Sequence, residues 1–205
     1  MEIKNADLPM KLRINTKPKR IRASKRKLGE SIENRPDSVN DRTEFGHWEI
    51  DTVIGKKTSD DCVLLTLAER QTRNFIVRKI SSKSAAAVMQ GIEELRSYYG
   101  DRFNQVFKSI TSDNGLEFAD LHTLDEIAGT KVYFTHPYSS SERGTNERHN
   151  GLIRRFIPKG TSISSFSVDK LFSIEYWCNT LPRKILGYRT PEELFEEHLN
   201  LIYAA

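Results

Sequence analysis

Three acidic residues, Asp51, Asp113 and Glu147, have the types and spacing expected of a magnesium site for phosphodiester chemistry. Asp51 lies in an apolar, alternating segment that begins at Gly46, and thirty-three residues separate Asp113 from Glu147. Phosphodiester cleavage needs an aligned nucleophile, neutralisation of developing charge and stabilisation of the leaving oxygen, which two Mg²⁺ ions about 4 Å apart can supply. Mg²⁺ takes oxygen ligands and usually only a few protein carboxylates, so acids from separate elements can hold it.

Each of these acids, taken alone, also has a structural explanation. Asp51 and Glu49 are two residues apart and share one face of a strand, which a solvated edge strand would also allow. Asp113 begins the turn-forming sequence Asp-Asn-Gly. Glu147 shares a helix face with Asn150, as residues on a solvent-exposed helix would. The joint occurrence of the three acids, with their flanking segments, favours the metal site.

Hydrophobic patterns predict the elements that would position these acids. Three strand-like segments with polar turns between them predict an antiparallel meander over 47–54, 62–68 and 75–80. Ser84 as an N-cap, apolar residues at helical spacing and Gly100 as a stop predict the helix that follows. Trp48, in the first of these strands, is expected in the core.

The rest of the chain alternates between short strands and helices. Strands are expected at 107–111 and 131–134, helices at 118–128, at about 142–156 and at 168–179, and a short helix from Pro191. The order β-β-β-α-β-α-β-α predicts an α/β fold with a single mixed sheet flanked by helices. Asp113 would then lie at the carboxyl end of a strand, where α/β sheets tend to place ligands.

Basic residues are concentrated at the N-terminus. Residues 1–30 contain ten Lys or Arg against three acids, whereas the remainder contains 22 against 25. Between Lys11 and Lys27 nine of seventeen residues are basic and none is acidic, which favours phosphate contacts with nucleic acid; a solvated disordered tail is the alternative. We therefore expect a basic, extended arm or linker over 1–42 and a core over 43–200.

Cysteine usage and the first residues indicate the compartment. Cys62 and Cys178 are far apart in sequence, and no Cys-x-x-Cys pair suggests zinc or redox chemistry. The first residues lack the apolar core of a signal peptide, and no run approaches the roughly 18 apolar residues that span a membrane. We expect a cytoplasmic protein, in a reducing compartment and without a membrane partner.

Five segments combine residues that are specific when taken together. They are Gly46-His47-Trp48-Glu49-x-Asp51, Ser112-Asp113-Asn114-Gly115-x-Glu117-Phe118, Arg143-Gly144-Thr145-Asn146-Glu147-x-x-Asn150-Gly151-Leu152-Ile153-Arg154, Phe156-Ile157-Pro158-Lys159-Gly160-Thr161 and Asn179-x-x-Pro182-Arg183-x-x-Leu186-Gly187-Tyr188-x-Thr190-Pro191. The chain closely resembles bacterial insertion-sequence transposases of the IS-thirty type over roughly residues 5 to 200. The resemblance implies a ribonuclease-H-like fold, as in retroviral integrases, with a mixed five-stranded sheet. It also implies that Asp51, Asp113 and Glu147 form a metal-binding DDE triad.

The same resemblance implies a reaction and its partners. The reaction is metal-dependent DNA cleavage at transposon ends with water as nucleophile, followed by attack of the freed 3′-hydroxyl on target DNA. Two Mg²⁺ ions are implied, with Mn²⁺ as a possible substitute, and a homodimer or higher assembly is expected because two ends must be joined. In the bacterial cytoplasm the protein would associate with the nucleoid. DNA contacts are expected from Arg143, Arg148, Asn150, Arg154 and Lys159 near the site and from Lys17, Lys19, Arg20 and Arg22 in the arm.

The chain departs from the family pattern in two places. Family members usually begin with helix-turn-helix segments that recognise terminal repeats, whereas this chain starts at what resembles the linker after them, as a truncated copy, a second reading frame or a trimmed chain would. Arg148 and His149 occupy positions that are commonly smaller or polar, and His149 is expected at the surface or facing phosphate. Two alternatives stay open: a catalytically inactive DNA-binding remnant, and a ribonuclease-H-type nuclease without strand transfer.

Overall fold

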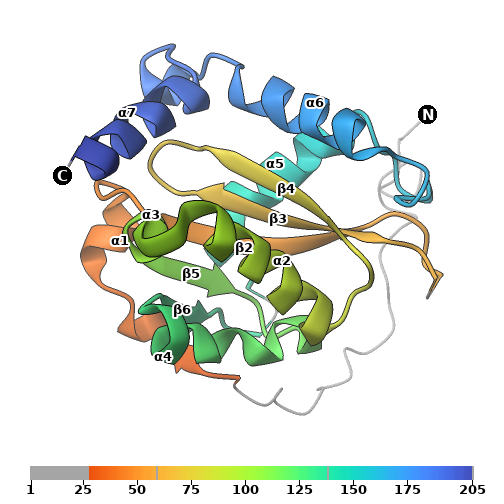
Figure 1. Ribbon diagram of the computed structural model, residues 1–205, viewed down its shortest axis with the longest axis horizontal. Coiled ribbons are helices and arrows are strands. Elements are labelled where there is room, and N and C mark those ends of the chain that lie inside the picture. Colours follow the sequence, from red (N-terminus) through yellow and green to blue (C-terminus); the bar gives the residue numbers. More distant parts are fainter. Residues whose placement is uncertain (1–27, 59, 138, 205) are drawn as a thin grey trace, which may run out of the picture.

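The structure is a computed structural model that describes residues 28–58, 60–137 and 139–204 of the 205-residue chain. Its centre is a six-stranded mixed sheet with strand order β1-β6-β5-β2-β3-β4 (Figure 1). β2, β3 and β4 form the predicted antiparallel meander, whereas β5 is parallel to both β2 and β6. The strands are β1 (Glu30–Ser31), β2 (His47–Ile54), β3 (Val63–Glu69), β4 (Phe75–Ile80), β5 (Ser109–Ser112) and β6 (Lys131–Phe134).

Helices flank this sheet, as the sequence predicts (Figure 1). α2 begins after Ser84, whose side chain accepts a hydrogen bond from the Ala87 N–H, and it ends at Gly100 with a positive φ of 53°. The α-helices are α1 (Asp37–Asp41), α2 (Ala85–Tyr99), α3 (Phe103–Val106), α4 (Leu124–Ala128), α5 (Gly144–Ile153), α6 (Val168–Asn179) and α7 (Pro191–Ala204). Short 3-10 helices are η3 (Ile32–Asn34), η4 (Gly100–Arg102), η5 (Leu116–Thr123), η6 (Ser140–Arg143) and η7 (Lys184–Leu186). Over the residues that the structure describes, no helix is long and apolar enough to cross a membrane.

The alternation of side chains along β2 separates two apolar cores. Trp48 and Ile50 are fully buried and pack with residues of α2 in the first core, which confirms the core position expected for Trp48. Val53 packs with residues of α5 and α6 in the second core. Glu49 and Asp51 have the same parity as Val53 and therefore face α5. Each face of β2 is thus covered by a helix, and the acids lie on the face that α5 covers.

The sheet has six strands, so the expectation of five is wrong. The additional strand is β1, which pairs in parallel with the edge strand β6. A two-residue strand is too short to show any hydrophobic period, and its pairing is decided by packing around it. The residues after β1 also pack against the sheet: Val39 is 1% exposed, and Arg35 Nη1 donates to Thr111 Oγ1 at 3.1 Å. Residues 28–42 are therefore part of the folded unit.

Three helical segments differ in detail from the sequence expectation. The helix expected over 118–128 is η5 followed by α4, and the helix expected over 142–156 is η6 followed by the shorter α5. α7 extends over fourteen residues and covers the first core through Phe195, whose ring lies 5.8 Å from that of Trp48. Hydrophobic pattern predicts element boundaries less well than element type, because fraying and capping contacts decide where a helix ends.

Candidate active site

Neighbouring parallel strands bring two of the three acids together. β2 and β5 pair with Glu49 beside Thr111. Continuing this register by two residues puts Asp51 beside Asp113, which directly follows the last residue of β5. Both side chains therefore lie at the carboxyl end of β5, a position at which α/β sheets commonly hold ligands.

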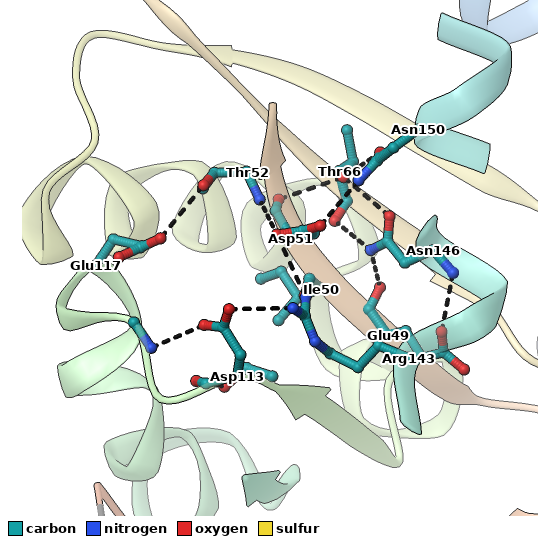
Figure 2. Close-up of polar contacts among 12 residues, drawn as sticks. Glu49, Ile50, Asp51, Thr52, Thr66, Asp113, Glu117, Arg143, Asn146 and Asn150 are labelled. Atoms are coloured by element: carbon teal, nitrogen blue, oxygen red, sulfur yellow. Dashed lines mark hydrogen bonds and ion pairs between the residues drawn. The ribbon is translucent and has the colours of Figure 1, made fainter. Parts of the chain in front are cut away.

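The guanidinium of Arg143 lies between these two carboxylates (Figure 2). Its Nη1 is 3.3 Å from Asp51 Oδ1, and its Nη2 is 3.0 Å from Asp113 Oδ2. Nη1 also donates to the carbonyl oxygen of Ile50 at 3.0 Å. The Arg143 side chain is 10% exposed, whereas those of Asp51 and Asp113 are 27% and 41% exposed. One nearly buried cation thus joins two carboxylates that remain partly open to solvent.

Burial and charge act in opposite directions on Asp51. Removal from water raises the pKa of the Asp51 carboxyl above its ordinary value, and the negative charge of Asp113 raises it further. The Arg143 guanidinium lowers this pKa, as does the Thr52 N–H, which donates to Asp51 Oδ1 at 2.8 Å. When ionised, the two carboxylates and one guanidinium leave one negative charge in excess. The cluster therefore attracts further positive charge.

Amide and hydroxyl side chains fasten α5 to the strand that carries Asp51 (Figure 2). Asn150 Nδ2 donates to Asp51 Oδ2 at 3.0 Å, and Asn146 Nδ2 donates to the carbonyl oxygen of Glu49 at 2.7 Å. The Thr66 hydroxyl of β3 lies 3.1 Å from Asn146 Oδ1 and 3.0 Å from Asn150 Oδ1. A spacing of four residues puts both asparagines on one side of the helix. α5 therefore sets the orientation of the Asp51 carboxylate.

Glu49 is a fully buried acid on the same face of β2. Its side chain is 0% exposed, lies 2.5 Å from Arg70 Nη1 and accepts the N–H of Asn146 at 2.9 Å. Arg70 also donates to the carbonyl oxygen of Val39 at 3.2 Å. Because β2 is an interior strand, the alternative of a solvated edge strand is wrong. Glu49 belongs to a buried ion pair that joins β2, the turn after β3 and α5.

Asp113 combines turn geometry with its place beside Asp51. Its Oδ1 accepts the N–H of Gly115 at 2.7 Å, as an Asp-Asn-Gly turn requires. A Cβ on Gly115 would lie 2.8 Å from Asp113 Oδ1 and 2.5 Å from Glu117 Oε2. Glu117 is 8% exposed, and Lys83 Nζ lies 2.9 Å from its Oε1. The absence of a side chain at Gly115 therefore lets a second, lysine-paired carboxylate approach Asp113.

Glu147 is exposed in the first half of α5. It lies three residues before Asn150, so these two share one face of the helix, and four residues after Arg143, the residue that precedes α5. Across residues 28–204, apart from 59 and 138, no three acidic, histidine or cysteine side chains are grouped closely enough to hold a metal ion. The place of Glu147 in a triad stays a prediction.

One protein family and several known proteins are similar to this chain in sequence. Residues 41–140 match the integrase core domain family. The probable transposase for insertion-like sequence element IS1161 of Streptococcus salivarius is 45% identical over 196 residues, which cover 96% of this chain and 55% of that protein. The transposase for insertion sequence element IS4351 of Bacteroides fragilis is 40% identical over 170 residues, or 82% of this chain and 50% of that protein. Residues 41–140 thus match the integrase core, and most of the chain is similar in sequence to insertion-sequence transposases.

Other relatives and a solved structure agree with this placement. The transposase InsI for insertion sequence element IS30A of Escherichia coli strain K12 is 34% identical over 177 residues, which cover 84% of this chain and 44% of that protein. The chain spans about half the length of these curated relatives. The crystal structure of the catalytic core domain of BIV integrase superposes with a TM-score of 0.56 at 19% identity, covering 78% of this chain and 99% of that chain. This likeness confirms the predicted ribonuclease-H-like fold.

The donor atoms of this integrase core suit a hard divalent cation. Asp51 and Asp113 offer carboxylate oxygens from adjacent strands, and both remain partly exposed. Mg²⁺ commonly binds through one or two carboxylates and completes its coordination with water and substrate phosphate oxygens. The Arg143 guanidinium already places one positive charge between the two carboxylates. The two aspartates therefore offer the oxygen donors that such a cation takes, on either side of the Arg143 guanidinium.

The side chains expected to contact DNA are distributed along α5 of the integrase core and beyond its end. Arg148 is exposed, whereas Arg143 and Asn150 are engaged with the aspartates. Arg154 donates to the carbonyl oxygen of the last β2 residue at 2.9 Å, and it lines a cavity of about 520 Å³ with Lys159. The four arm residues expected to bind DNA, Lys17, Lys19, Arg20 and Arg22, lie outside the described residues.

His149 is buried, so the expectation of a surface position is wrong. It is 2% exposed, with Nδ1 2.7 Å from the Thr145 carbonyl oxygen and Nε2 3.0 Å from the Arg73 carbonyl oxygen. Burial, together with the charges of nearby arginines, lowers the pKa of His149 to about 4. Its position three residues after Asn146 and four before Ile153, both buried, is the helical spacing that marks the inward face. His149 holds α5 against the turn between β3 and β4.

Proposed function

We propose that this chain cleaves DNA at the ends of a mobile element and joins the freed 3′-hydroxyl to target DNA. The observation that carries the proposal is the pair of carboxylates, Asp51 and Asp113, on adjacent strands of an integrase core with one negative charge in excess. The three curated relatives described above are transposases by name. The proposal extends their activity to this chain.

Two Mg²⁺ ions, replaceable by Mn²⁺, complete the proposed site, with Asp51, Asp113 and Glu147 as their protein ligands. Bound divalent cations at such a site lower the pKa of a water nucleophile and stabilise charge on the attacking and leaving oxygens. Glu147 makes no side-chain hydrogen bond or ion pair with any described residue, so no internal contact opposes its turning toward the aspartates. This exposure is compatible with a ligand that completes the site when cation and DNA are present.

The chain's own residues orient the carboxylates and contact the phosphate. Asn150 and the Thr52 N–H hold opposite oxygens of the Asp51 carboxylate. Arg143 keeps the Asp51 and Asp113 carboxylates paired, and its Nε has no hydrogen-bond partner among the described residues. A phosphate oxygen that approaches the aspartates would supply the missing acceptor in a charge-assisted hydrogen bond. Preorganised donors of this kind stabilise a transition state without reorganising during the reaction.

DNA is the proposed substrate and partner. Arg148, Arg154 and Lys159 would contact its phosphates together with the basic arm, and phosphate contacts of this kind set orientation rather than sequence preference. Joining two ends of one element requires two active sites close together, so a homodimer or higher assembly in the bacterial cytoplasm belongs to the proposal. Terminal-repeat recognition is assigned to no residue of this chain.

Substitution of the acids tests the proposed chemistry. Asp51→Asn, Asp113→Asn and Glu147→Gln each keep the size of the side chain and remove its charge. Cleavage of an oligonucleotide duplex carrying the element's end should fall at least about a hundredfold for each, since each removes a transition-state interaction. The matched control is Asp120→Asn, an exposed acid on η5 whose carboxylate makes no side-chain contact among the described residues. It should cleave as the unmodified chain does.

The outcomes separate the proposed reaction from its alternatives. Mg²⁺-dependent cleavage retained in the variant with all three substitutions would overturn the assignment of the acids. Salt-dependent DNA binding without any metal-dependent product would identify a binding remnant. Cleavage of an RNA–DNA hybrid, with no strand transfer from pre-cleaved ends, would identify a ribonuclease-H-type nuclease instead.

A further inference from the structure

A cluster of positively charged residues lies on the side of α5 opposite Asn150, which donates a hydrogen bond to Asp51. A cavity of about 830 Å³ is formed by the end of α1, the turn between β3 and β4, the first half of α5 and the loop after α6. No Asp or Glu lines it. We call it the basic pocket, and its cations are Arg42, Arg73, Arg148, Arg183 and Lys184.

The cations of the basic pocket lack acidic partners within the described part of the chain. Some other arginines of the fold are paired, namely Arg70 with Glu49 and Arg78 with Glu175. None of the five pocket cations forms an ion pair with a described carboxylate. Burial, together with the neighbouring charge of Arg42, lowers the pKa of Arg73 to about 10. The fold thus gathers positive charges that repel each other.

Two of these arginines have an unfavourable backbone conformation in addition to that repulsion. Arg42 and Arg73 both have positive φ angles, 58° and 65°, a conformation that costs free energy for a residue other than glycine. Arg73 Nη1 donates to Thr145 Oγ1 at 3.0 Å, which ties it to the start of α5. The Nε atoms of Arg73 and Arg183 are buried and have no hydrogen-bond partner among the described residues. An anion in the pocket would supply both charge and acceptors.

The pocket has the composition of a nucleic-acid contact rather than a small-anion site. Five cations spread over about 830 Å³ exceed what one phosphate group can neutralise. Ile185 lines the same cavity at 71% exposure, and Tyr188, on the same loop, is 70% exposed. Exposed apolar and aromatic side chains beside cations are typical of surfaces that track a nucleic-acid strand. α5 also links the pocket to the aspartates, through Arg148 on one side and Asn150 on the other.

We infer that the basic pocket binds backbone phosphates of a DNA strand whose neighbouring segment lies at Asp51 and Asp113. This inference deepens the proposed function and rests on it for the identity of the polymer. It also gives a role to the segment Asn179-x-x-Pro182-Arg183, because the loop after α6 contributes Arg183 and Lys184 to the pocket. The loop is thus part of the DNA-binding surface.

The test removes two exposed cations from the pocket and leaves its buried contacts intact. Arg148→Gln combined with Lys184→Gln should weaken binding of the full chain to a duplex oligonucleotide about tenfold, measured by fluorescence anisotropy. The slope of log Kd against log salt concentration should fall by about two, because two phosphates are no longer neutralised by the protein. The matched control, Arg102→Gln with Lys170→Gln, removes the same charge from residues that line none of the described cavities. It should change both quantities much less.

Further measurements separate the pocket from the proposed function. If the pocket variant and the control bind the duplex with the same affinity and the same salt dependence, the inference that the pocket binds DNA is overturned. Inorganic pyrophosphate could instead raise the unfolding temperature of the unmodified chain but not of the pocket variant, while both bind DNA equally well. That result would overturn DNA binding by the pocket in favour of a small-anion site. If DNA binding depends on the pocket but the chain shows no metal-dependent cleavage, the inferred role of the pocket is supported and the proposed reaction is overturned.

Discussion

Glu49 and Asp51 lie two residues apart on one face of β2, and each is paired with an arginine, yet their surroundings differ. Glu49 is 0% exposed and has Arg70 to itself, whereas Asp51 is 27% exposed and shares Arg143 with Asp113. The first pair is balanced in charge and closed to water. The cluster of Asp51, Asp113 and Arg143 has one excess negative charge and is partly exposed to water. Burial and charge balance, rather than residue type, distinguish an acid that holds the fold from one that can bind a ligand.

The same contrast separates the cations of the molecule. Arg70 is paired and nearly buried, so its charge is neutralised inside the protein. The cations of the basic pocket have no described acidic partner. The two clusters that the fold leaves uncompensated, one negative and one positive, both adjoin α5. A divalent cation and a polyanion are the ligands that would neutralise them.

Of the substitutions that test this contrast, Glu49→Gln should have the largest effect on stability. It leaves the charge of Arg70 buried without its partner, so the free energy of unfolding should fall by about 3–5 kcal/mol. Urea denaturation followed by circular dichroism measures the change. Adding Arg70→Met to Glu49→Gln should restore part of the stability, because no unpaired charge then remains. A decrease below about 1 kcal/mol in the single variant would show that water reaches this pair.

His149 is a buried titratable residue of α5, and its contribution to stability should depend on pH. The pKa of His149 is about 4 in the folded chain against an ordinary value of 6.5. As pH falls below 6.5 the unfolded chain takes up a proton that the folded chain refuses until about pH 4, so stability falls through this window. Between pH 7.5 and pH 5 the decrease from this residue should be about 2 kcal/mol.

Denaturant titrations of the unmodified chain and of His149→Gln at both pH values measure that decrease. The contribution is the difference between the two pH dependences, since the carboxylates titrate alike in both chains. The same pH dependence in both would contradict a buried, neutral His149.

Asp51→Asn should have the smallest effect on stability. The side chain is partly exposed, and its amide replacement removes a charge whose burial is unfavourable, so the free energy of unfolding should change by less than about 1 kcal/mol. Binding of Mn²⁺, followed by calorimetry, should be abolished in the same variant. A destabilisation as large as that of Glu49→Gln would place Asp51 with the structural acids and remove the contrast.

The sequence predicted the elements and their faces well where the hydrophobic period was long. The meander of β2, β3 and β4 and helix α2 lie where alternation and capping placed them. The shared face of Glu49 and Asp51 followed from the strand period of two. Patterns of this kind are local, so they can be read from neighbouring residues alone.

Other features depended on contacts between distant segments. β1 has two residues and no period of its own, so its pairing with β6 could not be read from the sequence. The burial of His149 depends on the turn that carries Arg73, seventy-six residues earlier. The basic pocket joins cations from four separate segments, and their common position follows only from packing.

The sequence by itself determined the family motifs, the two aspartates and the carboxyl-end position of Asp113, because motif spacing and strand period are properties of the linear chain. Only the tertiary structure decided that Arg143 stands between those aspartates, that Glu49 is structural and that five cations share one cavity. Burial and charge pairing depend on which distant side chains approach, and the folded arrangement of β2, β5 and α5 decides that.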